Sequence, residues 1–242
     1  MSEMPMVRRL MSVDIARGGA LAMMIAYHFT FDINLLARVG LDFNHDPLWL
    51  GLRALIVSLF LLLVGISQSI VHQQGFDRAR YLRRLVLLIV CAGLVTLGSR
   101  MLFPSSYIFF GILHFIALAS VLGLLTVRFY YFNLFSGISL ILCGNLYSHA
   151  WFDQPAFQWV GLMTHKPLTE DYVPLLPWFG AVQIGQYLGR VLYRLPAAAR
   201  IRGWSSSVLP LRLLALGGRH SLLIYMVHQP VLLGLLYLYL EF

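Results

Sequence analysis

Long apolar segments alternate with short polar connections along almost the whole chain. Seven of these segments are long enough for a membrane span, which needs about 20 mainly apolar residues: 11–36, 51–71, 85–103, 108–127, 129–147, 173–192 and 213–239. We find no internal repeat among them, so the two-fold architecture of many secondary transporters is not supported. The pattern predicts an all-α, polytopic transmembrane helix bundle with about seven spans, in a single domain over residues 1–242.

Composition and charge add an orientation to this picture. Of the 242 residues 59% are hydrophobic and only 12% are charged, which is about half the charged fraction of a soluble domain. The basic residues gather in alternate connections: Arg8, Arg9, Arg78, Arg80, Arg83, Arg84, Arg128, Arg190, Arg194, Arg200, Arg202 and Arg212. By the positive-inside rule the amino terminus is expected in the cytoplasm and, after seven spans, the carboxyl terminus outside. The net charge of +8 is then a topology signal that implies anionic lipid head groups, and not nucleic acid, as partners.

Four ionisable residues interrupt the first apolar segment. Asp14, Arg17, His28 and Asp32 fall within an arc of roughly 60° when the segment is a helix. Ionisable groups in hydrocarbon are costly and usually functional. Arg17 and His28 are separated by about 16 Å of helix rise, which predicts the arginine near the cytoplasmic surface and the histidine in the outer half. Asp32, one turn beyond His28, is expected to accept a hydrogen bond from its ring and to fix the tautomer.

Other polar residues extend the pattern to further segments. His114 and His228 are predicted in the outer halves of their spans, and Arg219 level with Arg17. Taken singly, His114 and His228 are more often structural than catalytic, but together they suggest an arginine layer near the cytoplasm and a histidine layer outside. The histidines lack the close spacing of zinc ligands, so no metal site is expected.

The motif Arg17-x10-His28 resembles the first-helix motif of the integral-membrane acyltransferases that O-acetylate surface polysaccharides. More closely, the chain resembles the bacterial relatives of heparan-alpha-glucosaminide N-acetyltransferase, through "VDIARGGALAMMIAYHFTFDINL", "FGILHFIALAS", "DYVPLLPWFGAVQIGQYLGR" and "GRHSLLIYMVHQPVLL". The resemblance implies a multi-pass acetyltransferase of the bacterial cytoplasmic (inner) membrane, with acetyl-CoA as acyl donor. In the lysosomal enzyme of that family the catalytic histidine lies in the loop after the first helix, where this chain has His45.

These expectations combine into a mechanism of acyl transfer across the membrane. Arg17 and Arg219, with Asp14, would bind the phosphates of cytoplasmic acetyl-CoA, because guanidinium pairs well with phosphate. His28 oriented by Asp32, or else His45, would deprotonate a sugar hydroxyl or amine on the outer side. The choice of base, O- or N-acetylation, direct transfer or an acetyl-enzyme, and the presence of a homo-oligomer stay open.

Four further residues are expected to contact the acceptor, a sugar or glycolipid: His114, His228, Gln229 and Trp178. Two other functions use the same polar helix face. A proton-coupled transporter or channel could use it as a relay, and a non-catalytic membrane module could bind a lipid or a partner helix through it. Binding of acetyl-CoA distinguishes the acyltransferase from both.

Overall fold

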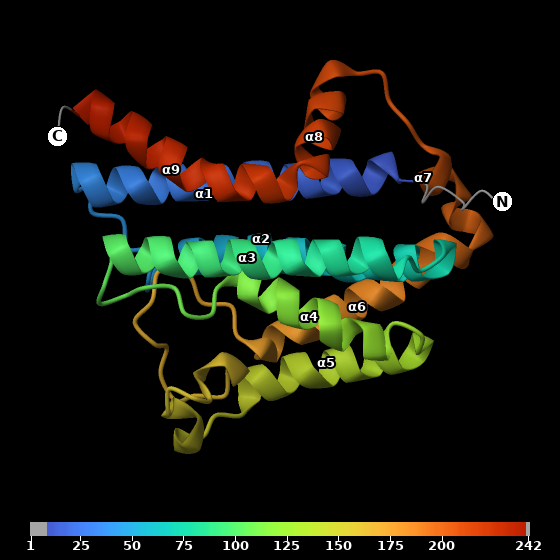
Figure 1. Ribbon diagram of the computed structural model, residues 1–242, viewed down its shortest axis with the longest axis horizontal. Coiled ribbons are helices and arrows are strands. Elements are labelled where there is room, and N and C mark those ends of the chain that lie inside the picture. The colour runs from blue at the N-terminus through green and yellow to red at the C-terminus, as the bar shows by residue number, and fades with distance from the viewer. Residues whose placement is uncertain (1–8, 241–242) are drawn as a thin grey trace. The chain divides into compact units, whose positions relative to one another are not determined.

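The computed structural model describes residues 9–240, in which every regular element is a helix. The α-helices are α1 (Met11–Ala37), α2 (Pro47–Gln74), α3 (Arg78–Leu102), α4 (Ile112–Thr126), α5 (Tyr130–Leu146), α6 (Leu175–Arg194), α7 (Ala199–Gly203), α8 (Leu209–Arg219) and α9 (Ser221–Leu240). Three short 3₁₀ helices, Ala150–Asp153, Gln158–Val160 and Pro196–Ala198, lie in the connections (Figure 1). The all-α prediction is confirmed for this part of the chain, and Arg8 lies outside it.

Within residues 9–240, four helices are long and apolar enough to cross a membrane: α1, α2, α3 and α9. α4 is apolar but shorter. The chain is therefore a multi-pass membrane protein by the length and composition of its helices. The number of seven spans stays a prediction.

The prediction of one helix over 213–239 is wrong. α8 ends at Arg219 and α9 begins at Ser221, with His220 between them at φ −104° and ψ 22°. Gly217 and Gly218 precede the break, and glycine is a poor helix former. The break lets α8 and α9 take different directions while both pack against α1 (Figure 1).

The described chain divides into two compact units, and α2 contributes residues to both. The first, which we call the α6 unit, is Leu61–Ala199. Within it α5 and α6 pack closely. Their backbones are so near that a Cβ atom added to Gly180 would lie 2.4 Å from the carbonyl oxygen of Gly137. Small residues allow such backbone contact between membrane helices.

Buried amide side chains join the helices of the α6 unit. Gln186 Nε2 donates to Gln68 Oε1 at 2.7 Å and to the carbonyl oxygen of Gly123 at 2.9 Å. Thr126 Oγ1 donates to Gln186 Oε1 at 2.9 Å. These bonds satisfy polar groups that hydrocarbon could not.

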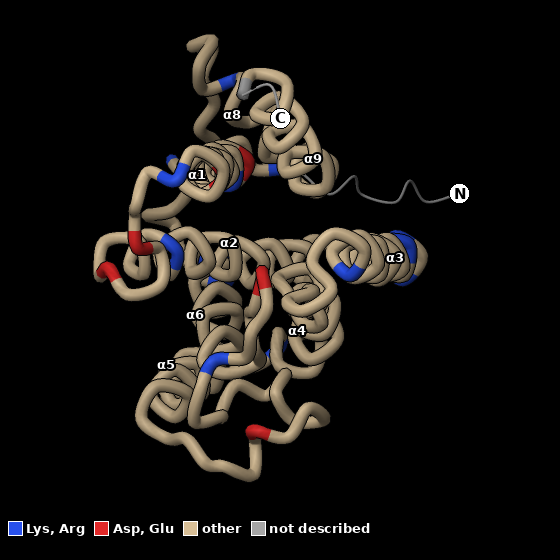
Figure 2. Tube along the Cα trace, turned by 90° about the vertical axis from the view of Figure 1, so that its left-hand side faces the viewer, with Lys and Arg blue, Asp and Glu red and all other residues tan. Residues whose placement is uncertain are grey.

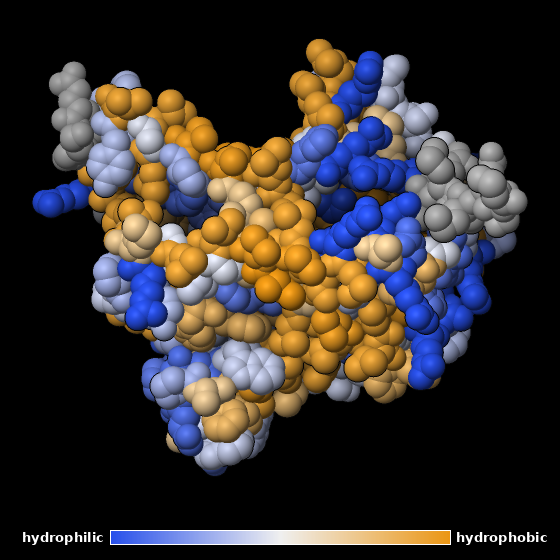
Figure 3. All heavy atoms as spheres, in the orientation of Figure 1, coloured by the Kyte–Doolittle hydropathy of each residue, from blue (hydrophilic) through white to orange (hydrophobic). Residues whose placement is uncertain are grey.

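α3 carries an apolar face that is open to its surroundings. Val86, Leu87, Val90 and Leu94 are all more than half exposed, and Figure 3 shows hydrophobic residues over this part of the surface. Hydrophilic residues gather at the amino-terminal, arginine-rich end of the helix. This distribution suits a helix whose long side faces lipid.

The second unit, which we call the α1 unit, consists of Arg9–Phe60 and the described residues from Arg200 onward. α1 packs against α8 and α9. At the crossing with α8 the two backbones touch: a Cβ atom on Gly18 would lie 2.0 Å from the carbonyl oxygen of Leu214, and one on Gly218 would lie 1.9 Å from that of Asp14. The two glycines thus determine which residues of α1 and α8 become neighbours.

Candidate functional site

Asp14 holds two arginines at one end of the α1 unit. Its Oδ2 atom accepts a hydrogen bond from Arg219 Nε at 3.1 Å, and its Oδ1 atom lies 3.6 Å from Arg17 Nη1. Arg17 Nη1 also lies 3.5 Å from the carbonyl oxygen of Gly218. Figure 2 shows acidic and basic residues together on α1, beside α8 and α9. Arg17 and Arg219 therefore lie at the same level, as the sequence predicted.

The two guanidinium groups differ in access. The Arg219 side chain is 45% exposed and that of Arg17 21% exposed, whereas the Asp14 side chain is 7% exposed. An anion approaching this cluster meets Arg219 first. Asp14 would repel the same anion, so its part in this cluster is to hold the two arginines.

A pair of histidines joins α1 to α9 further along the helices. His28 Nδ1 and His228 Nε2 are 2.9 Å apart, and the ring centroids are 5.0 Å apart. His228 is buried, and its Nδ1 atom lies 2.6 Å from the carbonyl oxygen of Tyr225 in the preceding turn. The pattern of the sequence indicated the same half of the membrane for both histidines. It could not indicate their contact, because they are 200 positions apart.

The predicted hydrogen bond from His28 to Asp32 is wrong. Asp32 Oδ1 accepts a bond from Gln229 Nε2 at 3.0 Å, while the His28 ring bonds to His228. Consecutive residues of α9 therefore engage two residues of α1 that are one turn apart. Asp32 Oδ2 and Gln229 Oε1 are buried without a hydrogen-bond partner among the described residues.

His45 lies in the loop between α1 and α2, and its side chain is 85% exposed. Its Nδ1 atom is 2.9 Å from Asp42 Oδ2. Backbone N–H groups of Asn44 and His45 also donate to Asp42, at 3.0 Å each. These hydrogen bonds, that of Asn44 first, lower the pKa of the Asp42 carboxyl. His45 thus has a carboxylate partner, which the sequence analysis did not identify.

Aromatic residues fix this loop to the helices of its unit. Phe43 is buried and stacks on Trp49, with 4.3 Å between ring centroids. Tyr27, next to His28 on α1, makes edge contacts with both rings. The backbone of Leu41 exchanges two hydrogen bonds with the side chain of Asn34. The loop that carries His45 is therefore ordered by its own side chains.

The remaining candidates, His114 and Trp178, belong to the α6 unit. His114 Nδ1 accepts from the backbone N–H of Gly111 at 3.3 Å, and Nε2 lies 3.0 Å from Thr96 Oγ1. Both ring nitrogens are thus used in capping α4 and joining it to α3, which favours a structural role. Trp178 is half-buried near the start of α6.

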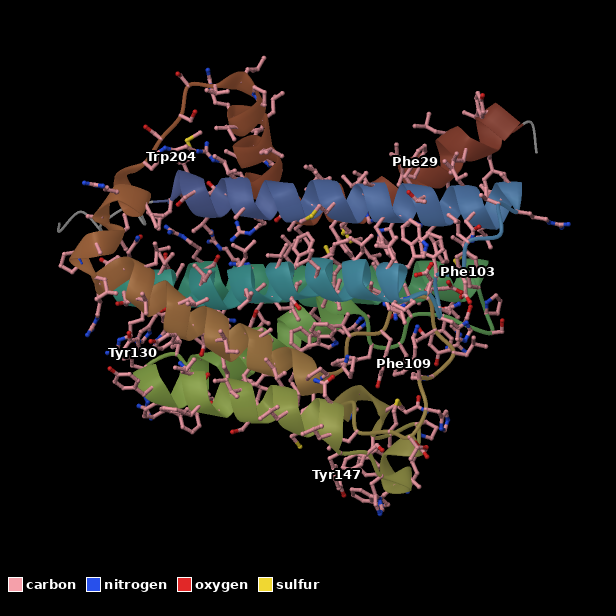
Figure 4. All side chains as sticks on the ribbon, turned by 180° about the vertical axis from the view of Figure 1, so that it is seen from behind. Phe29, Phe103, Phe109, Tyr130, Tyr147 and Trp204 are labelled. Atoms are coloured by element: carbon pink, nitrogen blue, oxygen red, sulfur yellow. The ribbon has the colours of Figure 1, made fainter. Side chains whose placement is uncertain are left out.

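An apolar groove of about 480 Å³ is lined by residues of α1 and α9 in the α1 unit. Phe29, the residue after His28, lies on the side of α1 that faces α9 (Figure 4) and lines this groove. The other lining residues are Ile33, Ala37, Leu232, Leu235, Leu236 and Tyr239. Such a lining suits an acyl chain better than a sugar.

A comparison with known proteins identifies the family of this chain. A family model described as heparan-alpha-glucosaminide N-acetyltransferase, catalytic, matches residues 9–230. No curated protein and no solved structure gives a significant match. The matched region includes the Asp14–Arg17–Arg219 cluster, the His28–His228 pair and His45. Because the match covers most of the chain, this protein belongs to the family of the heparan-alpha-glucosaminide N-acetyltransferase catalytic domain, a family of membrane acetyltransferases.

Proposed function

We propose that this protein transfers an acetyl group from cytoplasmic acetyl-CoA to a hydroxyl or amine of a sugar on the outer side of a bacterial cytoplasmic membrane. The observation that carries the proposal is the order of polar groups along α1. An arginine cluster lies at one level, and a histidine pair follows after about 16 Å of helix rise. In this proposal the amino terminus is cytoplasmic, and the chain crosses the membrane seven times, with α9 forming the last crossing.

The arginine cluster would bind the donor. Arg219, the more exposed of the two guanidinium groups, would pair with a phosphate of acetyl-CoA, and Arg17 would support it. The remainder of the donor would extend along α1, so that its thioester approaches the histidine level. Membership of an acetyltransferase family supports acetyl-CoA as the donor.

His28 would be the general base. Its Nε2 atom would take the proton of the acceptor O–H or N–H while the acceptor oxygen or nitrogen attacks the thioester carbonyl. The carbon–sulfur bond then breaks, and the proton passes from His28 to the leaving sulfur as free CoA. A positioned base is worth about 10²–10⁴-fold in rate. We favour His28 over His45 because His28 is half-buried on the helix that carries the arginines, whereas the His45 ring is largely in solvent.

The apolar groove of α1 and α9 supports a glycolipid acceptor. A lipid-linked sugar could leave its acyl chain in the groove of α1 and α9 while its polar group approaches the histidine pair. A soluble sugar would gain nothing from this lining. The acceptor assay should therefore include lipid-linked and free sugars.

Two measurements on the purified full chain in lipid nanodiscs test the proposal. Acetyl-CoA should raise the thermal midpoint, and Arg219→Gln should remove most of that shift. Arg212→Gln, a change of an exposed arginine on the same helix, is the matched control and should keep it. A wild-type protein that is folded but shows no shift with saturating acetyl-CoA would contradict the donor assignment.

An acetyl-transfer assay then separates the two candidate bases. His28→Ala should lower kcat by about 10²–10⁴-fold, and His45→Ala should have a smaller effect. His72→Ala, an exposed histidine at the end of α2, controls for loss of a histidine. If His45→Ala alone abolished transfer, the base would be His45 with its partner Asp42.

A further inference from the structure

We infer that His228 is a positioning residue: it fixes the tautomer of His28 so that Nε2 of His28, and not Nδ1, carries the free lone pair. The inference deepens the proposed function, since it says how the base is prepared. It rests on three groups that are linked in a row by hydrogen bonds: the Tyr225 carbonyl, the His228 ring and the His28 ring. Each step follows from what the group before it can donate or accept.

The first step concerns His228. A carbonyl oxygen can only accept a hydrogen bond, so the 2.6 Å contact between Tyr225 O and His228 Nδ1 requires a proton on Nδ1. A neutral imidazole has one N–H and one lone pair. Nε2 of neutral His228 is therefore an acceptor.

The second step derives which nitrogen of the His28 ring carries the proton. His228 Nε2 and His28 Nδ1 are 2.9 Å apart, and the hydrogen bond between them needs one proton. Because His228 Nε2 supplies a lone pair, His28 Nδ1 supplies the N–H. His28 Nε2 is then unprotonated, which is the state that a general base needs.

The third step excludes the nearest carboxylate as the orienting group. Asp32, one turn further along α1, uses Oδ1 for Gln229, and no hydrogen bond joins it to the His28 ring. No other described residue makes a hydrogen bond to the ring of His28. A proton added to His228 would reverse the bond and place the His28 proton on Nε2. The histidine pair therefore works as a base only while His228 is neutral.

If the His28–His228 hydrogen bond served only to join α1 to α9, either ring could be the donor. If it positions the base, His28 must be the donor, and the position of the proton can be measured. Solid-state NMR of the full chain in bilayers, labelled with ¹⁵N-histidine, distinguishes protonated from unprotonated ring nitrogens, and His28→Gln assigns the His28 signals. We expect the wild-type His28 proton on Nδ1 at neutral pH. In His228→Leu it should move to Nε2, the tautomer that a neutral histidine side chain prefers in water. His228→Gln, whose amide oxygen can accept from His28, should keep it on Nδ1.

Turnover completes the test. His228→Leu should lower kcat by about 10–100-fold, the range seen when the partner of a metal-bound histidine is removed, with KM for acetyl-CoA unchanged. His228→Gln should recover most of the rate. A wild-type His28 that is protonated on Nε2 overturns the inference. The ¹⁵N spectrum that shows this requires only the wild type and His28→Gln, the assignment control. Unchanged turnover in His228→Leu, with the tautomer altered, also overturns the positioning role.

Failure of the proposed function gives a different result. In that case the His28 proton of the wild type would be on Nδ1 and its position would depend on His228, but the protein would transfer no acetyl group to any acceptor. The orientation of His28 would then be correct and its use as a base in acetyl transfer would be wrong. The two ideas are thus contradicted by separate measurements.

Discussion

Arg219 Nε lies 3.1 Å from Asp14 Oδ2, a hydrogen bond between residues 205 positions apart. It joins the end of α8 to the first turns of α1, and Arg17 lies against the other carboxylate oxygen. A carboxylate that is 7% exposed needs such partners, because a buried charge without them is costly. The bond therefore has two consequences: it stabilises the α1 unit, and it directs a half-exposed guanidinium to a fixed place.

Replacement of Asp14 tests the first consequence. Asp14→Ala leaves two arginines without their shared partner and should lower the free energy of unfolding by about 1–2 kcal/mol, a value reduced for the exposure of Arg219. Thermal unfolding in detergent measures the effect. Arg212→Gln on the exposed side of α8 should leave the midpoint within about 1 °C. Equal midpoints for Asp14→Ala and the wild type would show that the cluster does not stabilise this unit.

Two adjacent glycines of α1 offer a matched test of the α1–α8 contact. In Gly18→Ala the new methyl group would lie 2.0 Å from the carbonyl oxygen of Leu214, so the helices must separate. In Gly19→Ala it would meet nothing within 4 Å. We expect Gly18→Ala to destabilise by about 1–3 kcal/mol and Gly19→Ala to stabilise by about 0.5–1 kcal/mol through helix propensity. Similar thermal midpoints for the two variants would contradict the close packing.

The helical periodicity of α1 was enough to predict its polar face. Arg17 and His28 were placed at different levels of one helix because rise and rotation per residue are fixed by backbone geometry. Arg219 was placed beside Arg17 because charge topology oriented its segment. Both inferences used information that a single sequence contains: the spacing of residues along a helix and the distribution of basic residues between the connections.

Contacts between distant segments could not be predicted in the same way. The sequence suggested Asp32 as partner of His28 because the two are four residues apart, but His228 and Gln229 of α9 engage them instead. That choice depends on how α9 packs on α1. The break at His220, which separates α8 from α9, was missed as well, because a hydrophobicity pattern does not register the two glycines before it.

Asp32 and Gln229 provide a prediction about unpaired oxygens. Each keeps one buried oxygen without a partner among the described residues. Asp32→Asn replaces a carboxylate oxygen by an N–H donor and keeps an acceptor for Gln229 Nε2, so the thermal midpoint should stay the same or rise. Asp32→Leu should lower stability by about 1–3 kcal/mol, because the Gln229 amide then loses its partner. A large loss of stability in Asp32→Asn would mean that the charge of Asp32 itself is needed.

The loop of His45 allows a prediction about pH, because it lies outside the spans. Hydrogen bonds from Asn44 and His45 lower the pKa of Asp42 below its ordinary value of 3.8. A carboxyl with a lowered folded pKa stabilises the loop fully above its unfolded pKa, and this contribution is lost as the pH falls through the folded pKa. The amide protons of Asn44 and His45, corrected for intrinsic exchange, should therefore keep constant protection from about pH 8 down to about pH 5. Asp42→Ala should remove that protection across the whole range, whereas Asp46→Ala, at the start of α2, should not. Protection that already decreases between about pH 7 and 6 would indicate that protonation of a histidine, and not the Asp42 carboxylate, controls the loop.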